Sequence, residues 1–324
     1  MDNNTPLKSP YVVDTMGELL RLDIPPRQYI LYPFIQEKSL CMLYAKRGTG
    51  KTFVGLSIAL VVSGGVDIMN FRAEKPYKVL YIDGEMPAQT MQERLSLLAM
   101  GLGDIYTGQD NLLILTPDRQ DIPMPNLAGA EGQQAIAPLL NDVKLLIVDN
   151  ISALCQYGKE NDAESWIQMQ KWLLELRRQD IAVLLIDHAG KNGDNRGTSK
   201  KQDILDAVIA LETPERHKAS DGCSFVVRYT KSRCICGEDV SEYEAHLEED
   251  EIGGLAWRVS KHITPKQQKH EETLGKVKEL LDKRLTYRAI AQQMGISKST
   301  VGEFAKELSV QNDAPIVDSG RTDT

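Results

Sequence analysis

The sequence predicts an α/β protein with a doubly wound, mainly parallel sheet, followed by a small all-α domain. Three observations lead to this prediction. Short β-rich runs recur from residue 38 onward with helical segments or loops between them, and the early runs are apolar throughout rather than alternating. Helical periodicity replaces the β-rich runs near the C-terminus. Continuous apolar strands are typical of a sheet that is covered by helices on both faces.

The expected strands cover residues 40–44, 79–82, 112–115, 145–148, 181–186, 207–211, 225–229 and 255–259. An almost wholly apolar helix is expected over residues 53–62, and a second helix over residues 162–178. The second helix has an apolar stripe that should face the core, formed by Trp166, Met169, Leu173 and Leu176. The acidic run at residues 242–251 is expected to bulge into solvent.

Proline, charge and polarity suggest where the chain divides. We expect an N-terminal lead-in at residues 1–37, the α/β domain at 38–262, a linker at 263–273, the helical domain at 274–310 and a disordered tail at 311–324. The lead-in is rich in proline, with one short helix possible at residues 15–22. The linker is polar and rich in lysine and glutamine, which indicates a solvated connection.

Bulk properties restrict the classes of partner. The 324 residues carry a net charge of −8 with a pI near 5.3, so contact with nucleic acid must come from local basic patches. The N-terminus is polar, and the apolar stretches are too short to span a bilayer. These features predict a cytoplasmic protein without a membrane partner.

The cysteine count is odd, which favours reduced thiols. Cys223, Cys234 and Cys236 could supply three metal ligands. A fourth ligand is not spaced convincingly, so no zinc site is predicted and the role of these cysteines stays open.

A phosphate-binding loop follows the first apolar strand and precedes the apolar helix. It consists of Ala45, Lys46, Arg47, Gly48, Thr49, Gly50, Lys51 and Thr52. Strand, glycine loop and helix in this order point backbone N–H groups and a helix N-terminus at a polyphosphate. Lys51 would contact the β- and γ-phosphates, and the Thr52 hydroxyl would be a ligand of Mg²⁺. Ala45 replaces the first glycine of the usual pattern. The loop predicts that ATP is bound.

Two carboxylates follow other apolar strands. Asp149 ends the run at residues 145–148, which is the usual place of a Walker B carboxylate that holds Mg²⁺ together with Thr52. Glu85 follows the strand at residues 79–82 and could orient the attacking water. Asp83 is the weaker candidate for the base. Either Asp83 or Glu85 could instead cap the helix that begins near residue 88.

His188 ends the expected strand at residues 181–186 and would sense the γ-phosphate. With Glu85 and Asp149 in place, residues 29–258 resemble the RecA-type motor ATPases, and among them the hexameric replicative helicases of the plasmid RepA type. The resemblance implies a RecA-like P-loop fold. It also implies a homo-oligomer, with a hexamer suspected, that hydrolyses ATP with Mg²⁺ at subunit interfaces and moves along single-stranded DNA. A DNA helicase in plasmid, phage or mobile-element replication is the expected function.

The same resemblance nominates groups that act between subunits. Arg228 and Arg233, on the strand at residues 225–229 and just after it, are the candidates for an arginine finger, with Lys231 beside them. A cationic strand edge explains the same residues without catalysis. In this family the loops at residues 152–161 and 191–202 point into the central channel. The second loop carries four cations, Lys191, Arg196, Lys200 and Lys201.

The helical domain has the spacing of a helix-turn-helix, with Ala291, Gly295 and Val301 at its three characteristic positions. Thr286 and Ser297 are placed as N-caps. A recognition helix starting at residue 298 would bind duplex DNA, although such a unit can also dock a protein.

Two other functions fit the same residues. The chain could be a regulatory or loader ATPase that changes conformation on hydrolysis without unwinding DNA. It could also be a DNA-binding adaptor in which the helix-turn-helix does the work and the nucleotide is structural.

Overall fold

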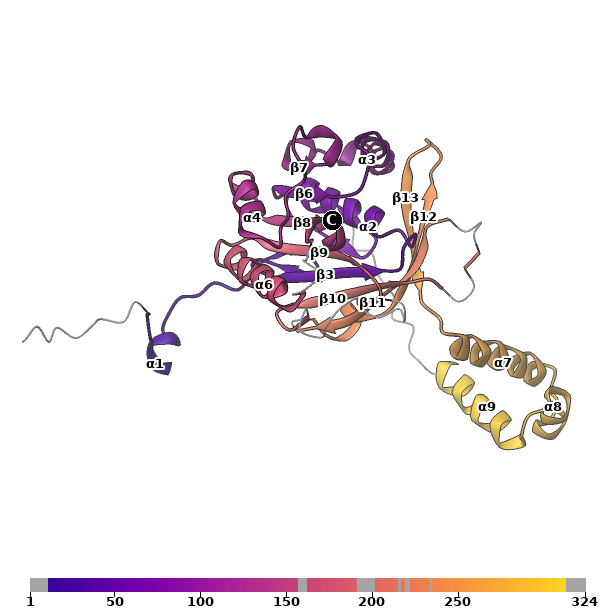
Figure 1. Cartoon of the computed structure of the whole chain (residues 1–324). Coiled ribbons are helices and arrows are strands. Elements are labelled where there is room, and N and C mark those ends of the chain that lie inside the picture. Colours follow the sequence, from indigo (N-terminus) through magenta and orange to yellow (C-terminus); the bar gives the residue numbers. More distant parts are fainter. Residues whose placement is uncertain are drawn as a thin grey trace, which may run out of the picture. The chain divides into compact units, whose positions relative to one another are not determined.

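The computed structural model describes residues 11–156, 162–190, 202–214, 217–218, 222–233 and 235–312. It consists of two compact units, Met1–Ser260 and Lys261–Thr324 (Figure 1). No helix within the described ranges is long and apolar enough to cross a membrane.

The first unit alternates strands and helices along most of its length. Its strands are β1 (Tyr29–Leu31), β2 (Ile35–Gln36), β3 (Leu40–Ala45), β4 (Asp67–Ile68), β5 (Phe71–Arg72), β6 (Val79–Asp83), β7 (Leu112–Leu115), β8 (Leu145–Asp149), β9 (Ala182–His188), β10 (Ala207–Glu212), β11 (Ser224–Ser232), β12 (Tyr243–Glu249) and β13 (Leu255–Lys261). Its α-helices are α1 (Met16–Leu19), α2 (Lys51–Gly64), α3 (Ala88–Leu102), α4 (Ala130–Ile136), α5 (Ile151–Leu154) and α6 (Asp162–Arg178).

Nine strands form one sheet in the order β13-β12-β11-β10-β3-β9-β8-β6-β7. The six strands from β10 to β7 are parallel, and β11 and β12 extend them in antiparallel pairing. Every residue of β3, β6, β8 and β9 is buried, as the continuous apolar runs predict. The predicted doubly wound, mainly parallel sheet is therefore confirmed.

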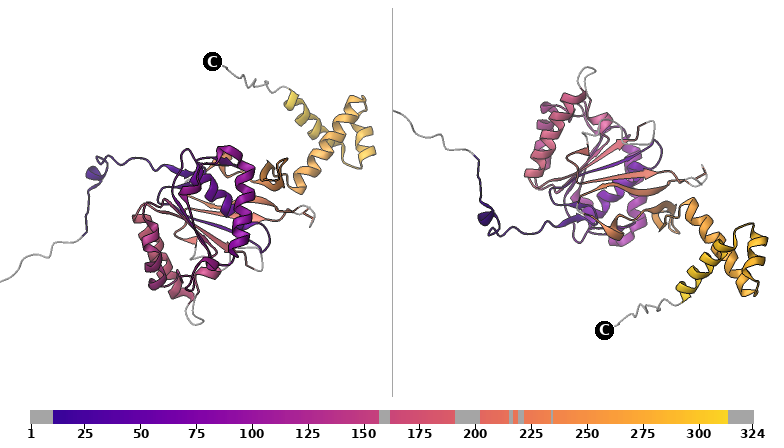
Figure 2. Two further views of the ribbon diagram at one scale, coloured as in Figure 1. Left: turned by 90° about the horizontal axis from the view of Figure 1, so that it is seen from above. Right: turned by 90° about the horizontal axis from the view of Figure 1, so that it is seen from below.

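Helices cover both faces of the sheet (Figure 2). Helices α2 and α3 pack on one face, and α4, α5 and α6 pack on the other. The predicted stripe on α6 is confirmed, because Trp166, Met169, Leu173 and Leu176 are each no more than 4% exposed. Helix α2 is apolar on nearly all sides because it is buried on nearly all sides.

The end of the sheet near β13 curls over α2 (Figure 1). Trp257 of β13 donates from Nε1 to the Ser57 hydroxyl of α2 over 2.8 Å. A Cβ atom at Gly101, in the last turn of α3, would lie 2.2 Å from the Leu255 carbonyl oxygen. The last strand therefore encloses α2 and touches α3 at a position that only glycine allows.

The predicted solvent bulge at residues 242–251 is wrong, because most of this run is strand β12. Tyr243 and Ala245 are buried, whereas Glu244 and His246 alternate with them and are partly exposed. This period of two satisfies one buried face and one wet face of an antiparallel strand. The density of carboxylates hides that alternation in the sequence.

The segment expected as a lead-in has two structural parts. Residues 11–28 are all exposed, and we call them the N-terminal arm. Within the arm, Thr15 and Glu18 form a capping box that starts α1. The β1-β2 hairpin that follows is part of the core, with Ile30, Leu31 and Ile35 fully buried. The first ordered packing of this unit therefore begins before residue 38.

The second unit contains three helices, α7 (Pro265–Asp282), α8 (Tyr287–Met294) and α9 (Lys298–Asn312). Its small core is centred on Val277, Ile290 and Val301. The linker expected at residues 263–273 is instead helical from Pro265 onward. Lysine, glutamine and glutamate are strong helix formers, so a polar composition suits a solvent-facing helix as well as a linker.

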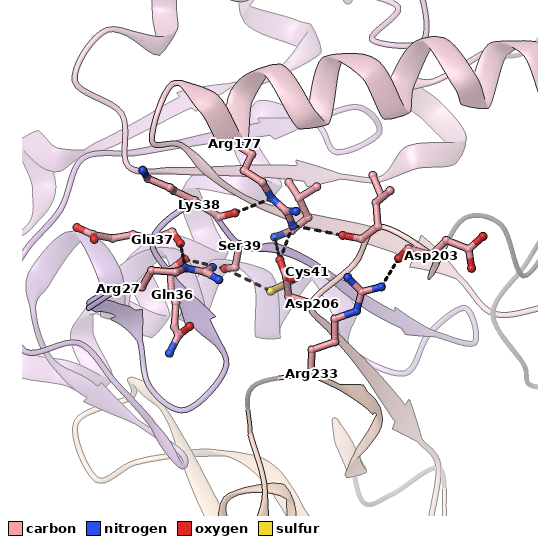
Figure 3. A network of polar contacts seen from close by, with 12 residues as sticks. Arg27, Gln36, Glu37, Lys38, Ser39, Cys41, Arg177, Asp203, Asp206 and Arg233 are labelled. Atoms are coloured by element: carbon pink, nitrogen blue, oxygen red, sulfur yellow. Dashed lines mark hydrogen bonds and ion pairs between the residues drawn. The ribbon is translucent and has the colours of Figure 1, made fainter. Parts of the chain in front are cut away.

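A polar network ties the sheet together at the ends of the strands opposite the phosphate loop (Figure 3). The Asp206 carboxylate accepts from the Leu40 N–H at 2.9 Å and from Arg177 of α6 at 2.6 Å. Arg177 also donates to the Lys38 carbonyl oxygen, and the Arg233 N–H donates to the Asp206 carbonyl oxygen. One aspartate thus joins β3, β10, β11 and α6.

Replacing Asp206→Ala should lower the free energy of unfolding by about 2–4 kcal/mol, because it leaves a guanidinium and a buried N–H unpaired. Urea unfolding followed by tryptophan fluorescence measures this, since all three tryptophans lie in the first unit. Glu175→Ala is the matched control, because it removes only an exposed ion pair on α6 and should cost less than about 0.5 kcal/mol. Equal effects of the two variants would contradict this role of Asp206.

Candidate functional site

A cleft of about 700 Å³ lies at the carboxyl ends of the parallel strands. This volume lies in the range of small-molecule sites, and the carboxyl edge of an open α/β sheet is where ligands bind. The lining comes from β6, β8 and β9, the phosphate loop, α2, α3 and the start of β11: Arg47, Gly48, Gly50, Lys51, Thr52, Phe53, Asp83, Glu85, Met86, Arg94, Asp149, Asn150, His188, Gly222 and Cys223.

The predicted phosphate loop connects the buried strand β3 to the N-terminus of α2. Gly48 and Gly50 have φ values of 79° and 108°, which disfavour any residue with a side chain. A Cβ atom at Gly50 would also lie 2.2 Å from the sulfur of Cys223. The loop therefore needs glycine at residue 50 both for its backbone and for the packing of β11 against it.

Lys51 is buried, and its ammonium is held inside the loop. Nζ donates to the carbonyl oxygens of Ala45 and Lys46 at 3.1 and 3.0 Å. Burial lowers the pKa of Lys51, while the nearby carboxylates of Asp149 and Asp187 act in the opposite direction. The cation is thus fixed beside the loop, where phosphate oxygens of a nucleotide would bind.

Asp149 ends β8 at the bottom of the cleft and is only 3% exposed. Tyr81 donates its hydroxyl proton to Oδ2 over 2.6 Å. Burial raises the pKa of Asp149, and hydrogen bonds from Tyr81 and from Thr52 lower it. A hydroxyl and a carboxylate in contact beside a phosphate loop are hard oxygen donors, which fits the binding of Mg²⁺.

Asp83 and Glu85 follow β6 and have different surroundings. Asp83 is buried and accepts from the Met86 N–H at 2.6 Å and from the Glu85 N–H at 3.3 Å. Burial, with smaller contributions from Asp149 and Glu85, raises the pKa of Asp83 to about 7. Glu85 is exposed on the wall of the cleft. Asp83 therefore fixes the loop, and the Glu85 carboxylate faces the space where a ligand would lie.

His188 ends β9 and pairs in register with Ala45 of β3. Its Nε2 lies 3.4 Å from Nδ2 of Asn150, and its Nδ1 has no hydrogen-bond partner among the described residues. Burial lowers the pKa of His188, and Lys51 and Arg47 add to this effect. A neutral imidazole can donate a proton to a phosphate oxygen from one nitrogen and accept at the other.

Arg228 and Arg233 do not line the cleft of their own chain. Arg228 forms ion pairs with Glu242 and Glu212 on the outer part of the sheet. Arg233 lies at the far end of β11, is exposed, and donates to the Asp203 carbonyl oxygen (Figure 3). The neighbouring Lys231 donates to the Gln202 carbonyl oxygen. An arginine that completes the site of another subunit has to lie away from its own cleft.

Three lining residues escaped the sequence reasoning: Arg94, Phe53 and Cys223. The Arg94 guanidinium of α3 lies 4.7 Å from the ring centroid of Phe53 and adds a third cationic side chain to the cleft, beside Arg47 and Lys51. Its position nine residues after Glu85 on an amphipathic helix could have suggested it. The Cys223 thiol lies 3.7 Å from the Thr49 carbonyl oxygen, and burial raises its pKa to about 11.

Several predicted residues lie outside the described ranges. These are Cys234, the cations Lys191, Arg196, Lys200 and Lys201, and most of the two loops at residues 152–161 and 191–202. No group of three or more metal-binding side chains of histidine, cysteine, aspartate or glutamate occurs among the residues that are described.

Comparison with known proteins agrees with this geometry. The model of the AAA_25 family, described as an AAA domain, matches residues 6–194, which is more than half of the chain. A KaiC-like protein from the hyperthermophilic archaeon Pyrococcus horikoshii has a similar structure, with a TM-score of 0.50 and 16% identity over 69% of this chain and 90% of that one. At this identity the likeness concerns the fold. The curated proteins contain no match.

The raised pKa of Asp83 predicts a pH dependence. Because the folded pKa lies near 7 and the ordinary value is 3.8, the folded state holds this proton more tightly. Its contribution to stability is complete below about pH 4 and is lost as pH rises through 7. The free energy of unfolding of Asp83→Asn relative to wild type should therefore rise between pH 5 and pH 8.

Urea unfolding at the two pH values, with EDTA and without nucleotide, measures this difference. Asp104→Asn, at an exposed position after α3, is the control and should leave the difference flat. A difference for Asp83→Asn that does not change with pH would mean that the carboxyl group is ionised normally.

Proposed function

Because the chain belongs to the AAA_25 family and has a RecA-like P-loop ATPase fold, we propose that it is an ATP-hydrolysing motor of the RepA type. On this proposal it assembles as a homo-oligomeric ring and moves along single-stranded DNA as a helicase or translocase in plasmid, phage or mobile-element replication. One observation carries the proposal. Glu85, Asp149 and His188 come from the ends of three different strands and line one cleft with the phosphate loop.

The residues of the cleft divide the work of hydrolysis. Lys51 and the loop N–H groups bind the phosphates, and Thr52 and Asp149 hold Mg²⁺, which neutralises phosphate charge. Glu85 orients the attacking water and accepts its proton. Asp83 keeps the Glu85 loop in place through its two backbone hydrogen bonds.

His188 provides a route from the nucleotide to the DNA-binding loops. The ring donates to the γ-phosphate while the triphosphate is intact and loses that partner on hydrolysis. Its Nε2 contacts the side chain of Asn150, and Oδ1 of Asn150 caps α5 by accepting from the Ala153 N–H. A shift of His188 would therefore reach α5 and the loop at residues 152–161.

Arg233 is the better candidate for a finger that completes the site of a neighbouring subunit. Its side chain is exposed and is held by a single carbonyl contact, whereas two carboxylates hold Arg228. A guanidinium can leave one carbonyl oxygen for a phosphate at small cost, but leaving an ion-pair cluster costs more.

The C-terminal unit supports the proposal through its local geometry. The hydroxyl groups of Thr286 and Ser297 cap α8 and α9, and Gly295 ends α8 in the left-handed conformation with φ of 65°. We propose that this unit is a helix-turn-helix and that the N-terminus of α9, with Lys298 and its neighbours, contacts duplex DNA.

Glu85→Gln should reduce ATP turnover about 10²–10⁴-fold while nucleotide affinity is retained, because the amide cannot accept a proton. Steady-state hydrolysis and binding of a fluorescent ATP analogue measure the two effects. Glu93→Gln is the matched control, since Glu93 is exposed one helical turn away on α3 and its oxygen only meets Gln89. Hydrolysis that survives Glu85→Gln would remove Glu85 as the catalytic base.

Arg233→Ala should reduce turnover of the assembled protein about 10³-fold or more, which is the usual effect of losing an arginine finger. Mixing this variant with Lys51→Ala should restore part of the turnover, because an intact finger then meets an intact phosphate loop. Arg178→Ala, at a highly exposed position on α6, is the control. Mixing that restores nothing would indicate that Arg233 acts within its own chain or not at all.

The proposal as a whole predicts a ring whose ATP turnover rises when single-stranded DNA is added. Light scattering coupled to size-exclusion chromatography gives the mass, and a forked duplex tests strand displacement. DNA-stimulated turnover without displacement would favour the regulatory or loader ATPase. A monomer with slow turnover that ignores DNA would favour the adaptor.

A further inference from the structure

The N-terminal arm exposes more apolar surface than a solvated segment needs. Seven large apolar side chains between residues 12 and 24 are 51–89% exposed: Val12, Val13, Met16, Leu19, Leu20, Leu22 and Ile24. Contiguous exposed apolar side chains of this kind mark an interaction site. The arm has local order despite its exposure, because Thr15 and Glu18 cap α1. The family match starts at residue 6, so the arm belongs to the family domain.

A second uncovered surface lies at the β7 edge of the large sheet. Strand β7 pairs only with β6, and all four of its residues, Leu112–Leu115, are apolar and partly exposed. An open edge without charge or proline is normally covered. On the α3 side of β7 lies an apolar hollow of about 860 Å³, and on the α4 side lies another of about 410 Å³.

The arm and this edge have matching shapes. Residues 12–15 are extended and contain the neighbouring pair Val12 and Val13, whose side chains point to opposite faces of a strand. An added strand on β7 would place one valine toward each hollow. The apolar side chains of α1 and the residues after it would then enter the larger hollow, beside Leu95 and Ala99 of α3.

The charges of the two surfaces are also complementary. The larger hollow is lined by one charged side chain, Arg119, and by no carboxylate. The arm carries Asp14, Glu18 and Asp23 against the single Arg21 before residue 25. Attraction between the acidic arm and the arginine at the rim favours one docking site over other apolar surfaces.

We propose that residues 12–24 of one copy add to β7 and fill the α3-side hollow of a second copy. The arm of each chain is exposed along its whole described length, so it does not fill the hollow of its own chain. Since each copy has one arm and one edge, the contact is head-to-tail, and such contacts form rings when the rotation closes. The inference rests on the self-association in the proposed function and names the surfaces that produce it.

The test measures the mass of the full-length chain by light scattering for wild type, Val12→Asp/Val13→Asp and Ser96→Trp. The first variant damages the arm, and the second fills the hollow from an exposed position on α3. Each variant should be monomeric at concentrations where wild type assembles, with affinity weakened about 100-fold or more because apolar anchors dominate such contacts. Mixed in equal amounts they should form dimers, since the pair retains one intact arm and one intact edge.

Ile252→Glu is the matched control, because Ile252 is 68% exposed in the turn between β12 and β13 and should not change the mass. Variants that assemble like wild type would overturn this inference and leave the ring proposal standing. A wild type that is monomeric under all conditions, with ATP and with single-stranded DNA, would overturn the ring as well. Circular dichroism of each variant excludes unfolding as the cause of a lower mass.

Discussion

The burial of helix α2 is the constraint on which the rest of the first unit depends. This helix has to carry the phosphate loop at its N-terminus, and its apolar side chains have to be covered on all sides. The parallel sheet covers one side, α3 covers another, and the curled strand β13 closes over Ser57 through Trp257. A fixed α2 in turn fixes the position of Lys51 and Thr52, because both lie in its first turn.

The same burial determines the electrostatics of the cleft. Asp83, Asp149 and Lys51 are all less than 10% exposed, so the pKa values of the two carboxyls are raised and that of the lysine is lowered. Each of these groups is therefore prepared to meet an opposite charge, which a phosphate with its metal ion supplies. Glu85 alone among the carboxylates of the lining is exposed, and this difference separates the group that can accept a proton from the groups that hold the site.

The two edges of the sheet differ in how they are finished. At one edge, the antiparallel strands β11 to β13 curl onto α2, and the outer side carries ion pairs such as that of Arg228 with Glu242. At the other edge, β7 keeps an apolar strand open between two hollows. The first edge stabilises the chain itself, and the second has the properties of a surface that another chain covers.

The sequence by itself determined the sheet, the phosphate loop and the strand-end positions of Glu85, Asp149 and His188, because continuous apolar runs and glycine spacing are local patterns. It misassigned the run at residues 242–251, where charge outweighed a period of two, and the helical residues after Pro265, where polarity suggested a linker. Only the tertiary structure brought Arg94 and Cys223 into the cleft and separated Asp83 from Glu85 by burial. Those features depend on which distant elements meet, and a local pattern carries no information about that.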